Sequence, residues 1–224
     1  MSAASAFMAA RPRVKICCVA SVGEMRAAVR AGASAVGLVS EMPSGPGVIG
    51  EDLIAEIAAR TPPAVATFLL TCAQDAASIV AQQRRCRTNT LQLCDRVPAG
   101  VYGELRAELP GVSLVQVVHV AGQESFDEAL DAARHVDALL LDSGDQSLPV
   151  KELGGTGRTH DWRVSRRVVE ASPVPVFLAG GLRPENVAGA VAAVRPFGLD
   201  VCSGVRSGGR LDPEKLGRFF AHLV

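Results

Sequence analysis

Aromatic side chains are scarce in this sequence: Phe, Trp and Tyr make up 4% of its 224 residues, with a single Trp and a single Tyr. The hydrophobic residues, 48% of the chain, must therefore build a core mainly from Val, Ala and Leu. Such a core is typical of a parallel β-sheet covered by helices, and a chain of this length can bury one. We expect an α/β fold.

An excess of charge of either sign is also absent, because 23 Lys and Arg residues balance 23 Asp and Glu residues. This balance argues against nucleic acid or a membrane surface as the main partner. No hydrophobic run approaches the roughly 20 residues of a membrane span. The Ala-rich start does not have the pattern of a signal peptide. We therefore expect a cytoplasmic protein, with a flexible N-terminal lead at residues 1–12 and one domain at residues 13–224.

Closely spaced cysteine pairs of the CxxC type are missing as well. The six cysteines are Cys17, Cys18, Cys72, Cys86, Cys94 and Cys202. In a chain of this size without an export signal, a disulfide framework is not expected, and reduced, mostly buried thiols are.

One unit repeats along the chain: a short hydrophobic run followed by a stretch with helical spacing. The runs predict strands at Val14–Val19, Ala35–Val39, Val65–Leu70, Thr90–Leu93, Leu114–Val120, Ala138–Leu141, Val174–Ala179 and Leu199–Cys202. The stretches predict helices at Glu24–Ala31, Glu51–Arg60, Asp75–Arg85, Ala99–Glu108, Ser125–Arg134, Asp161–Glu170, Pro184–Val194 and Pro213–Leu223. The runs are continuous rather than alternating, as in strands buried on both faces.

Eight such units favour a single (β/α)8 TIM barrel over an open doubly wound sheet, which usually has five or six strands. Local signals agree with several helix ends: Ser21 and Glu24 form a capping box, Pro184 and Pro213 suit first turns, and Gly32 suits a helix end. The long Gly-rich connection Glu152–Thr159 predicts a lid or ligand clamp.

Function in a barrel lies at the C-terminal ends of the strands. The seventh and eighth predicted strands end in the turns AGGL and CSGV, which contain Gly180, Gly181, Ser203 and Gly204. Backbone N–H groups of such turns can converge on a phosphate, because glycine lets the anion approach closely. The sequence therefore predicts a phosphate site there. The alternative is that these glycines only make tight turns.

Two side chains at other strand ends could carry acid–base chemistry. Asp142 closes the apolar run ALLLD and can serve as a general acid or base, or alternatively as a helix cap or ion-pair partner. Cys17 follows Lys15 at the end of the first strand and could act as a base or nucleophile, or be an inert buried cysteine. A further alternative is a metal site made by Cys17, Cys94, Cys202 and His119, although no closely spaced ligand pair supports it.

The motifs also carry a resemblance. VKICCVAS, AGASAVGLV, DALLLDS, LGGTGRTHDW, VFLAGGLRPENV and LDVCSGVRS together resemble the blocks of the phosphoribosylanthranilate isomerase family, from Arg13 onward. The resemblance implies an Amadori rearrangement of a phosphorylated aminoribose, from aldose-amine to ketose-amine, in tryptophan biosynthesis. It implies a small phosphorylated substrate and acid–base chemistry without a cofactor or metal. We expect a monomer or a homodimer.

Carried over by position, the resemblance assigns roles to individual residues. Cys17 resembles the general base that takes the C2′ proton of the Schiff base, and Asp142 resembles the general acid that protonates the ring oxygen. The implied phosphate-binding residues are Gly155, Gly180, Gly181, Ser203 and Gly204. The candidates on the substrate side are Lys15, Cys94, His119 and Arg206.

The chain departs from the family pattern on the substrate side. Pro46 or Gly47 stands where the family has an arginine for the anthranilate carboxylate, and Cys94 stands for a histidine. Other departures are Cys18 for a glycine, Gln116 near the position of a lysine, and Arg206 for a glutamate. Three interpretations follow: a working isomerase in which Arg206 or Arg210 receives the carboxylate, a paralogue for another phosphorylated substrate in specialised metabolism, or a non-catalytic sugar-phosphate-binding barrel.

Overall fold

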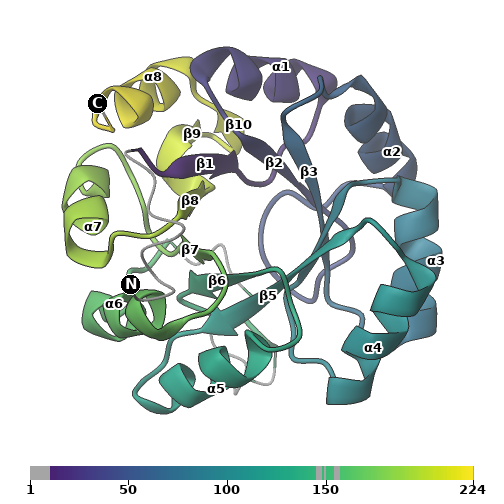
Figure 1. Ribbon diagram of the computed structural model, residues 1–224. Coiled ribbons are helices and arrows are strands. Elements are labelled where there is room, and N and C mark those ends of the chain that lie inside the picture. Colours follow the sequence, from purple (N-terminus) through teal and green to yellow (C-terminus); the bar gives the residue numbers. More distant parts are fainter. Residues whose placement is uncertain (1–10, 145–147, 149, 154–156, 224) are drawn as a thin grey trace.

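The computed structural model is a closed barrel of eight parallel strands in sequential order, with helices on the outside (Figure 1). It describes residues 11–144, 148, 150–153 and 157–223, so most of the expected N-terminal lead lies outside the described residues. The strands are β1 (Arg13–Ile16), β2 (Ala35–Val39), β3 (Ala66–Thr71), β4 (Thr90–Leu93), β5 (Ser113–His119), β6 (Ala138–Asp142), β7 (Val176–Leu178) and β8 (Gly198–Val201). The barrel closes where β1 pairs with β8, with Lys15 opposite Asp200.

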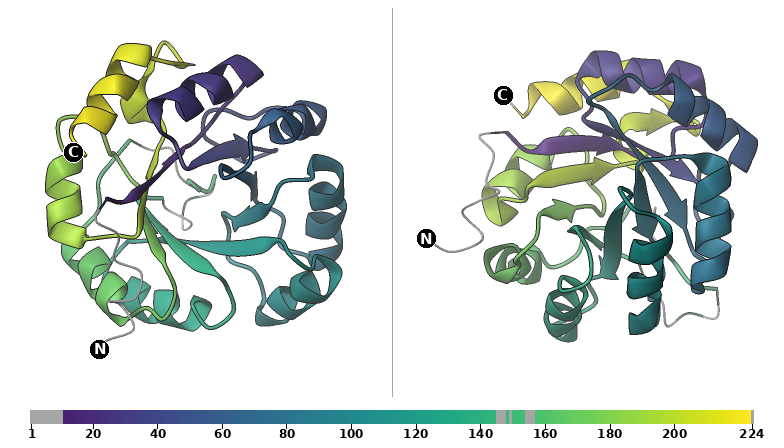
Figure 2. Two further views of the ribbon diagram at one scale, coloured as in Figure 1. Left: turned by 45° about the horizontal axis from the view of Figure 1, so that its top comes forward. Right: turned by 45° about the vertical axis from the view of Figure 1, so that its right-hand side comes forward.

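Eight α-helices follow the strands within the described residues. Figure 2 shows the arrangement of these helices around the barrel from two further sides. The helices are α1 (Val22–Ala31), α2 (Glu51–Arg60), α3 (Ala76–Cys86), α4 (Ala99–Glu108), α5 (Glu124–Ala132), α6 (Trp162–Ala171), α7 (Val187–Val194) and α8 (Pro213–Ala221). The predicted (β/α)8 barrel is confirmed.

The expected helix ends hold with one exception. Ser21 Oγ accepts from the Glu24 N–H, Gly32 ends α1 in the left-handed conformation, and Pro213 opens α8. The prediction for Pro184 is wrong, because α7 begins only at Val187. The preceding residues form a turn in which the Asn186 side chain accepts from the Arg183 N–H and donates to the Gly181 carbonyl.

The hydrophobic residues form two layers. The larger layer lies between strands and helices and includes Ile16, Leu38, Leu69 and Phe219. A smaller cluster fills the barrel interior, with Phe68, Leu70, Val117, Leu140 and Phe177 among its members. Successive strand residues alternate between these layers, which explains why the strand sequences are hydrophobic throughout.

Sequence analysis did not anticipate a small hairpin after β8, made of β9 (Arg206–Ser207) and β10 (Arg210–Leu211). Its turn residues, Gly208 and Gly209, both have positive φ, as a two-residue hairpin turn requires. None of the helices in the described part of the chain has the length and hydrophobicity needed to cross a membrane.

Candidate active site

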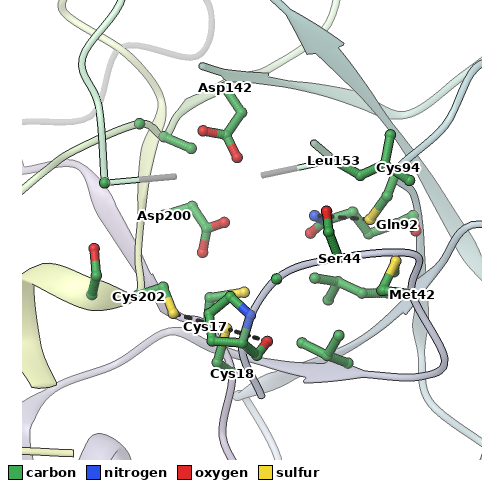
Figure 3. Close-up of a pocket in the computed structure, with 18 of the residues that line it drawn as sticks. Cys17, Cys18, Met42, Ser44, Gln92, Cys94, Asp142, Leu153, Asp200 and Cys202 are labelled. Atoms are coloured by element: carbon green, nitrogen blue, oxygen red, sulfur yellow. Dashed lines mark hydrogen bonds between the residues drawn. The ribbon is translucent and has the colours of Figure 1, made fainter. Parts of the chain in front are cut away.

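A cavity opens at the C-terminal ends of the strands. Its walls come from strands and loops far apart in the sequence: Cys17, Cys18, Val39, Met42, Ser44, Gly45, Pro46, Leu70, Gln92, Cys94, Asp142, Leu153, Gly157, Ala179, Gly180, Gly181, Leu182, Asp200, Cys202 and Ser203. Figure 3 shows the carboxylates of Asp142 and Asp200 and several thiols around one space.

Two glycine turns form one end of this cavity. Gly180 and Gly181, after β7, have φ values of 83° and 59°. A Cβ on Gly204, after β8, would lie 1.9 Å from the Leu182 carbonyl oxygen, so the two turns approach each other at backbone distance. Gly180, Gly181 and Ser203 line the cavity. Only glycine permits this approach, which brings backbone groups of both turns to one place.

Cys17 and Asp142 line the same cavity from different strands. Cys17 directly follows β1, and its N–H donates to the Val201 carbonyl of β8 over 2.9 Å. Asp142 is the last residue of β6, and its Oδ1 accepts from the Ser143 N–H over 2.7 Å. Both residues are more than 90% buried. The pair supplies a thiol and a carboxyl group in a space shielded from bulk water.

A buried ion pair lies next to Cys17. Lys15 is fully buried, and its Nζ donates to Asp200 Oδ1 over 2.9 Å. Burial raises the pKa of Asp200, and the Lys15 ammonium opposes this shift. Burial alone would lower the pKa of Lys15, but the Asp200 carboxylate raises it above its ordinary value. A Cβ on Gly37 of β2 would lie 2.9 Å from Lys15 Nζ, so the small residue makes room for the ammonium.

The remaining predicted residues divide between the cavity wall and its surroundings. Of the substrate-side candidates, Cys94 lines the cavity, whereas Lys15, His119 and Arg206 do not. His119 Nε2 lies 3.0 Å from the Cys94 carbonyl oxygen, behind the wall. The Arg206 guanidinium pairs with Glu24 and donates to the carbonyls of Cys17 and Cys18. Gly155 lies outside the described residues, although Leu153 and Gly157 of the same Gly-rich segment line the cavity.

Sequence analysis missed several lining residues. Asp200 carried a signal, since a buried Asp and a buried Lys on adjacent strands must pair. Gln92 carries an Oε1 atom that is buried without a partner, a property invisible in the sequence. Met42, Ser44 and Leu153 come from loops whose path depends on the folded barrel. Within the described ranges, no three His, Cys, Asp or Glu side chains are arranged to hold a metal ion. The alternative of a metal site at Cys17, Cys94, Cys202 and His119 therefore has no support from these residues.

Comparisons with known proteins agree with this geometry. The family model for N-(5'-phosphoribosyl)anthranilate (PRA) isomerase matches residues 14–222. An N-(5'-phosphoribosyl)anthranilate isomerase of Methanocella arvoryzae is 34% identical over 95% of this chain and 97% of its own length. One from Haloarcula marismortui is 39% identical over 92% of this chain and 94% of its own. This chain belongs to the phosphoribosylanthranilate isomerase family.

A solved structure adds a ligand to the comparison. It is a phosphoribosyl anthranilate isomerase in complex with reduced 1-(o-carboxyphenylamino)-1-deoxyribulose 5-phosphate. It superposes with a TM-score of 0.75 at 26% identity and covers 95% of this chain and 98% of its own. The phosphoribosylanthranilate isomerase barrel is thus shared over nearly the whole chain, including all eight strands.

Proposed function

We propose that this chain converts phosphoribosylanthranilate into its ketose-amine isomer, the reaction of its family in tryptophan biosynthesis, with Cys17 as the base and Asp142 as the acid. Family membership supports the reaction. The observation that carries the residue roles is that both side chains line one buried cavity whose end is built from the glycine turns. An intramolecular proton shift of this kind needs an acid and a base, and the iminium itself serves as the electron sink.

The cavity orients the substrate by its two unlike ends. A phosphate bound at Gly180, Gly181 and Ser203 lies near the ends of β7 and β8. The opposite side of the barrel is at β4, so the other end of the substrate lies there. The sugar then spans the centre, between Cys17 and Asp142.

Asp142 donates a proton to the ring oxygen, which opens the ring to the Schiff base. The Cys17 sulfur takes the C2′ proton, and the electron pair moves toward the iminium nitrogen. The aromatic ring lies against Met42, Leu70, Leu153 and Cys94.

The carboxylate of the anthranilate group calls for a cation at this aromatic end. No Lys or Arg is among the described residues that line the cavity, and Arg206 is engaged by Glu24. Lys151 lies at the rim there: its carbonyl accepts from Ser44 Oγ over 2.6 Å, and its ammonium pairs with Asp95 at 2.6 Å. Its side chain is 38% exposed, so its remaining N–H donors face accessible space. Lys151 is therefore our candidate for the carboxylate, in place of Arg206.

The test is a steady-state assay with phosphoribosylanthranilate on the wild type and two variants. Asp142→Asn cannot donate the ring-opening proton, and Cys17→Ser offers a much weaker base. Each should lower kcat by about 10²–10⁴-fold with little change in KM. The control is Asp131→Asn, at an exposed position of α5, which should behave as wild type. Turnover near the wild-type rate in either site variant would remove that residue from the mechanism.

A further inference from the structure

Two thiols meet at the wall of the cavity. Cys18 Sγ lies 2.8 Å from Cys202 Sγ and accepts a hydrogen bond from it, although the two residues are 184 positions apart. Cys18 belongs to the loop after β1, and Cys202 directly follows β8, so the contact joins the two strands at which the barrel closes. Both thiols line the cavity and are therefore within reach of a small molecule that enters it (Figure 3).

Cys18 has an energetically unfavourable backbone conformation. Its φ is 60°, in the left-handed region that non-glycine residues rarely adopt. The side chain also restricts the facing loop, because a Cβ on Gly47 would lie 2.5 Å from Cys18 Cβ. Unfavourable conformations of this kind persist where the surrounding structure imposes them, and they concentrate at functional positions. Packing alone does not explain a strained cysteine at a place where glycine would avoid the strain.

Arg206 of the β9–β10 hairpin holds this pair together. Its guanidinium donates to the carbonyls of Cys17 and Cys18 and pairs with Glu24. The hydrogen bond with Cys18 and the nearby Arg206 charge lower the pKa of Cys202, against the effect of burial. Hydrogen bonds with Cys17 and Cys202, together with burial, raise the pKa of Cys18. Cys202 is thus the more easily ionised thiol of the two, which suits it as the attacking cysteine and Cys18 as the resolving one.

We propose that Cys18 and Cys202 form a peroxide-oxidisable dithiol that closes into a reversible disulfide inside the active cavity. The Cys202 sulfur attacks a hydroperoxide, an S–O bond forms, the O–O bond breaks, and water or an alcohol leaves after protonation. The Cys18 sulfur then attacks Cys202, the S–S bond forms, and the sulfenic oxygen leaves as water. The two thiols lose two electrons and two protons, and the peroxide accepts both. A low-molecular-weight thiol reverses the reaction by exchange.

The disulfide acts on the catalytic cavity because of its neighbours in the chain. Cys18 directly follows Cys17, the proposed base. Cys202 directly precedes Ser203, which belongs to the glycine turn after β8 that we propose binds the phosphate. The Cys18 thiol also donates to the carbonyl of Pro46 over 3.5 Å, and Pro46 lines the aromatic end. Oxidation removes that proton and releases the loop around Pro46. We therefore expect a severalfold higher KM in the oxidised protein, a readout that rests on the proposed function.

The experiment treats the full-length protein with stoichiometric hydrogen peroxide and reads mass, cross-linked peptides and thermal stability. We expect a loss of two hydrogens and a peptide pair joining Cys18 to Cys202. We also expect a rise in Tm of roughly 5–15 °C, because the cross-link closes a very long loop of the unfolded chain. Dithiothreitol should reverse all three. Mass, peptides and Tm do not depend on catalysis, so they test the disulfide even if the proposed function fails.

Matched variants separate this pair from the other thiols. Cys18→Ser and Cys202→Ser should each abolish the cross-link and the Tm rise, whereas Cys72→Ser, at a half-exposed cysteine outside the cavity wall, should retain both. A disulfide that contains Cys17, or irreversible oxidation without any cross-link, would overturn the proposal. An unchanged KM in fully cross-linked protein would overturn the coupling to the cavity.

Discussion

The two ends of the cavity are built in different ways. The end at β7 and β8 is built from backbone, through Gly180, Gly181 and the turn of Ser203 and Gly204. The opposite end is built from side chains of separate loops, such as Met42, Leu153 and Cys94. Backbone recognition depends on a conformation that few residues besides glycine permit. A side-chain wall can change by single substitutions, so we expect substitutions to alter the aromatic end more easily than the glycine turns.

The aromatic end also shows how one substitution constrains another. Cys18 and Gly47 face each other across two loops, and both have positive φ. While Cys18 is present, a larger residue at position 47 has no space. The cation that we propose for the substrate carboxylate therefore comes from another element: Lys151, after β6, contacts Ser44 of the cavity wall through its carbonyl.

The largest effect is expected at the backbone-built end. Gly204→Ala would place a methyl group 1.9 Å from the Leu182 carbonyl oxygen and force the two turns apart. We expect kcat/KM to fall by more than about 100-fold, mainly through a higher KM. The displaced glycine turns would lose several charge-assisted hydrogen bonds to the phosphate. The measurement is steady-state kinetics together with Tm. Gly189→Ala, in α7 with open space around it, is the control and should be neutral or slightly stabilising.

The next largest effect is expected at the side-chain-built end. Lys151→Ala should raise KM for phosphoribosylanthranilate by roughly 10- to 150-fold, the value of a hydrogen bond to a charged group, with kcat retained. Lys151→Arg keeps the charge and should recover much of the loss. If Lys151→Ala leaves KM unchanged, Arg206→Ala and Arg210→Ala are the variants that test the other cations.

A double-mutant cycle tests the contact between Cys18 and Gly47. Gly47→Arg alone should destabilise the protein, because a Cβ there would lie 2.5 Å from Cys18 Cβ and the φ of 84° disfavours any side chain. Cys18→Gly in the same chain removes the steric conflict but not the φ penalty. We expect a coupling free energy of about 1–3 kcal/mol by urea unfolding. Additive effects would show that the two positions are independent.

The smallest effect concerns pH and Glu24, outside the cavity. Burial alone would raise the pKa of Glu24, but Arg206 and the N–H groups of Leu211 and Ala20 lower it below its ordinary value. A lowered pKa in the folded state stabilises the protein above the unfolded-state pKa of about 4.3, and this contribution is lost as the pH falls through the folded value. Glu24→Gln should therefore lower Tm at pH 7, and the difference from wild type should shrink as the pH falls below about 4.

The control for this pH profile is Glu56→Gln, which removes an exposed pair with Arg60 on α2. Exposed pairs contribute little, so its Tm should follow wild type over the whole range. A Glu24→Gln difference that persists unchanged down to pH 3 would show that the carboxylate charge is not the source of the stability.

The architecture of this protein could be predicted from local sequence patterns. Eight hydrophobic runs and eight helical stretches predicted the barrel, and their bounds agree with the structure to within a few residues. Pro184 gave a wrong start for the seventh helix, because proline is common in turns as well as in the first turn of a helix. The hairpin at Gly208 and Gly209 was readable from its Gly-Gly turn but was not recognised. These signals are local, and local signals depend on spacing and residue type alone.

Which chemical groups meet depends on the folded barrel. Cys17 and Asp142 could be chosen from the sequence, but Asp200 was missed, because only the closure of β1 on β8 brings Lys15 to Asp200 and Cys18 to Cys202. The structure also shows that Arg206 forms an ion pair with Glu24, so its charge is already neutralised by a neighbouring carboxylate. Contacts between residues nearly 200 positions apart depend on strand register and loop paths. Those follow from packing of the whole barrel and leave no periodic trace in the sequence.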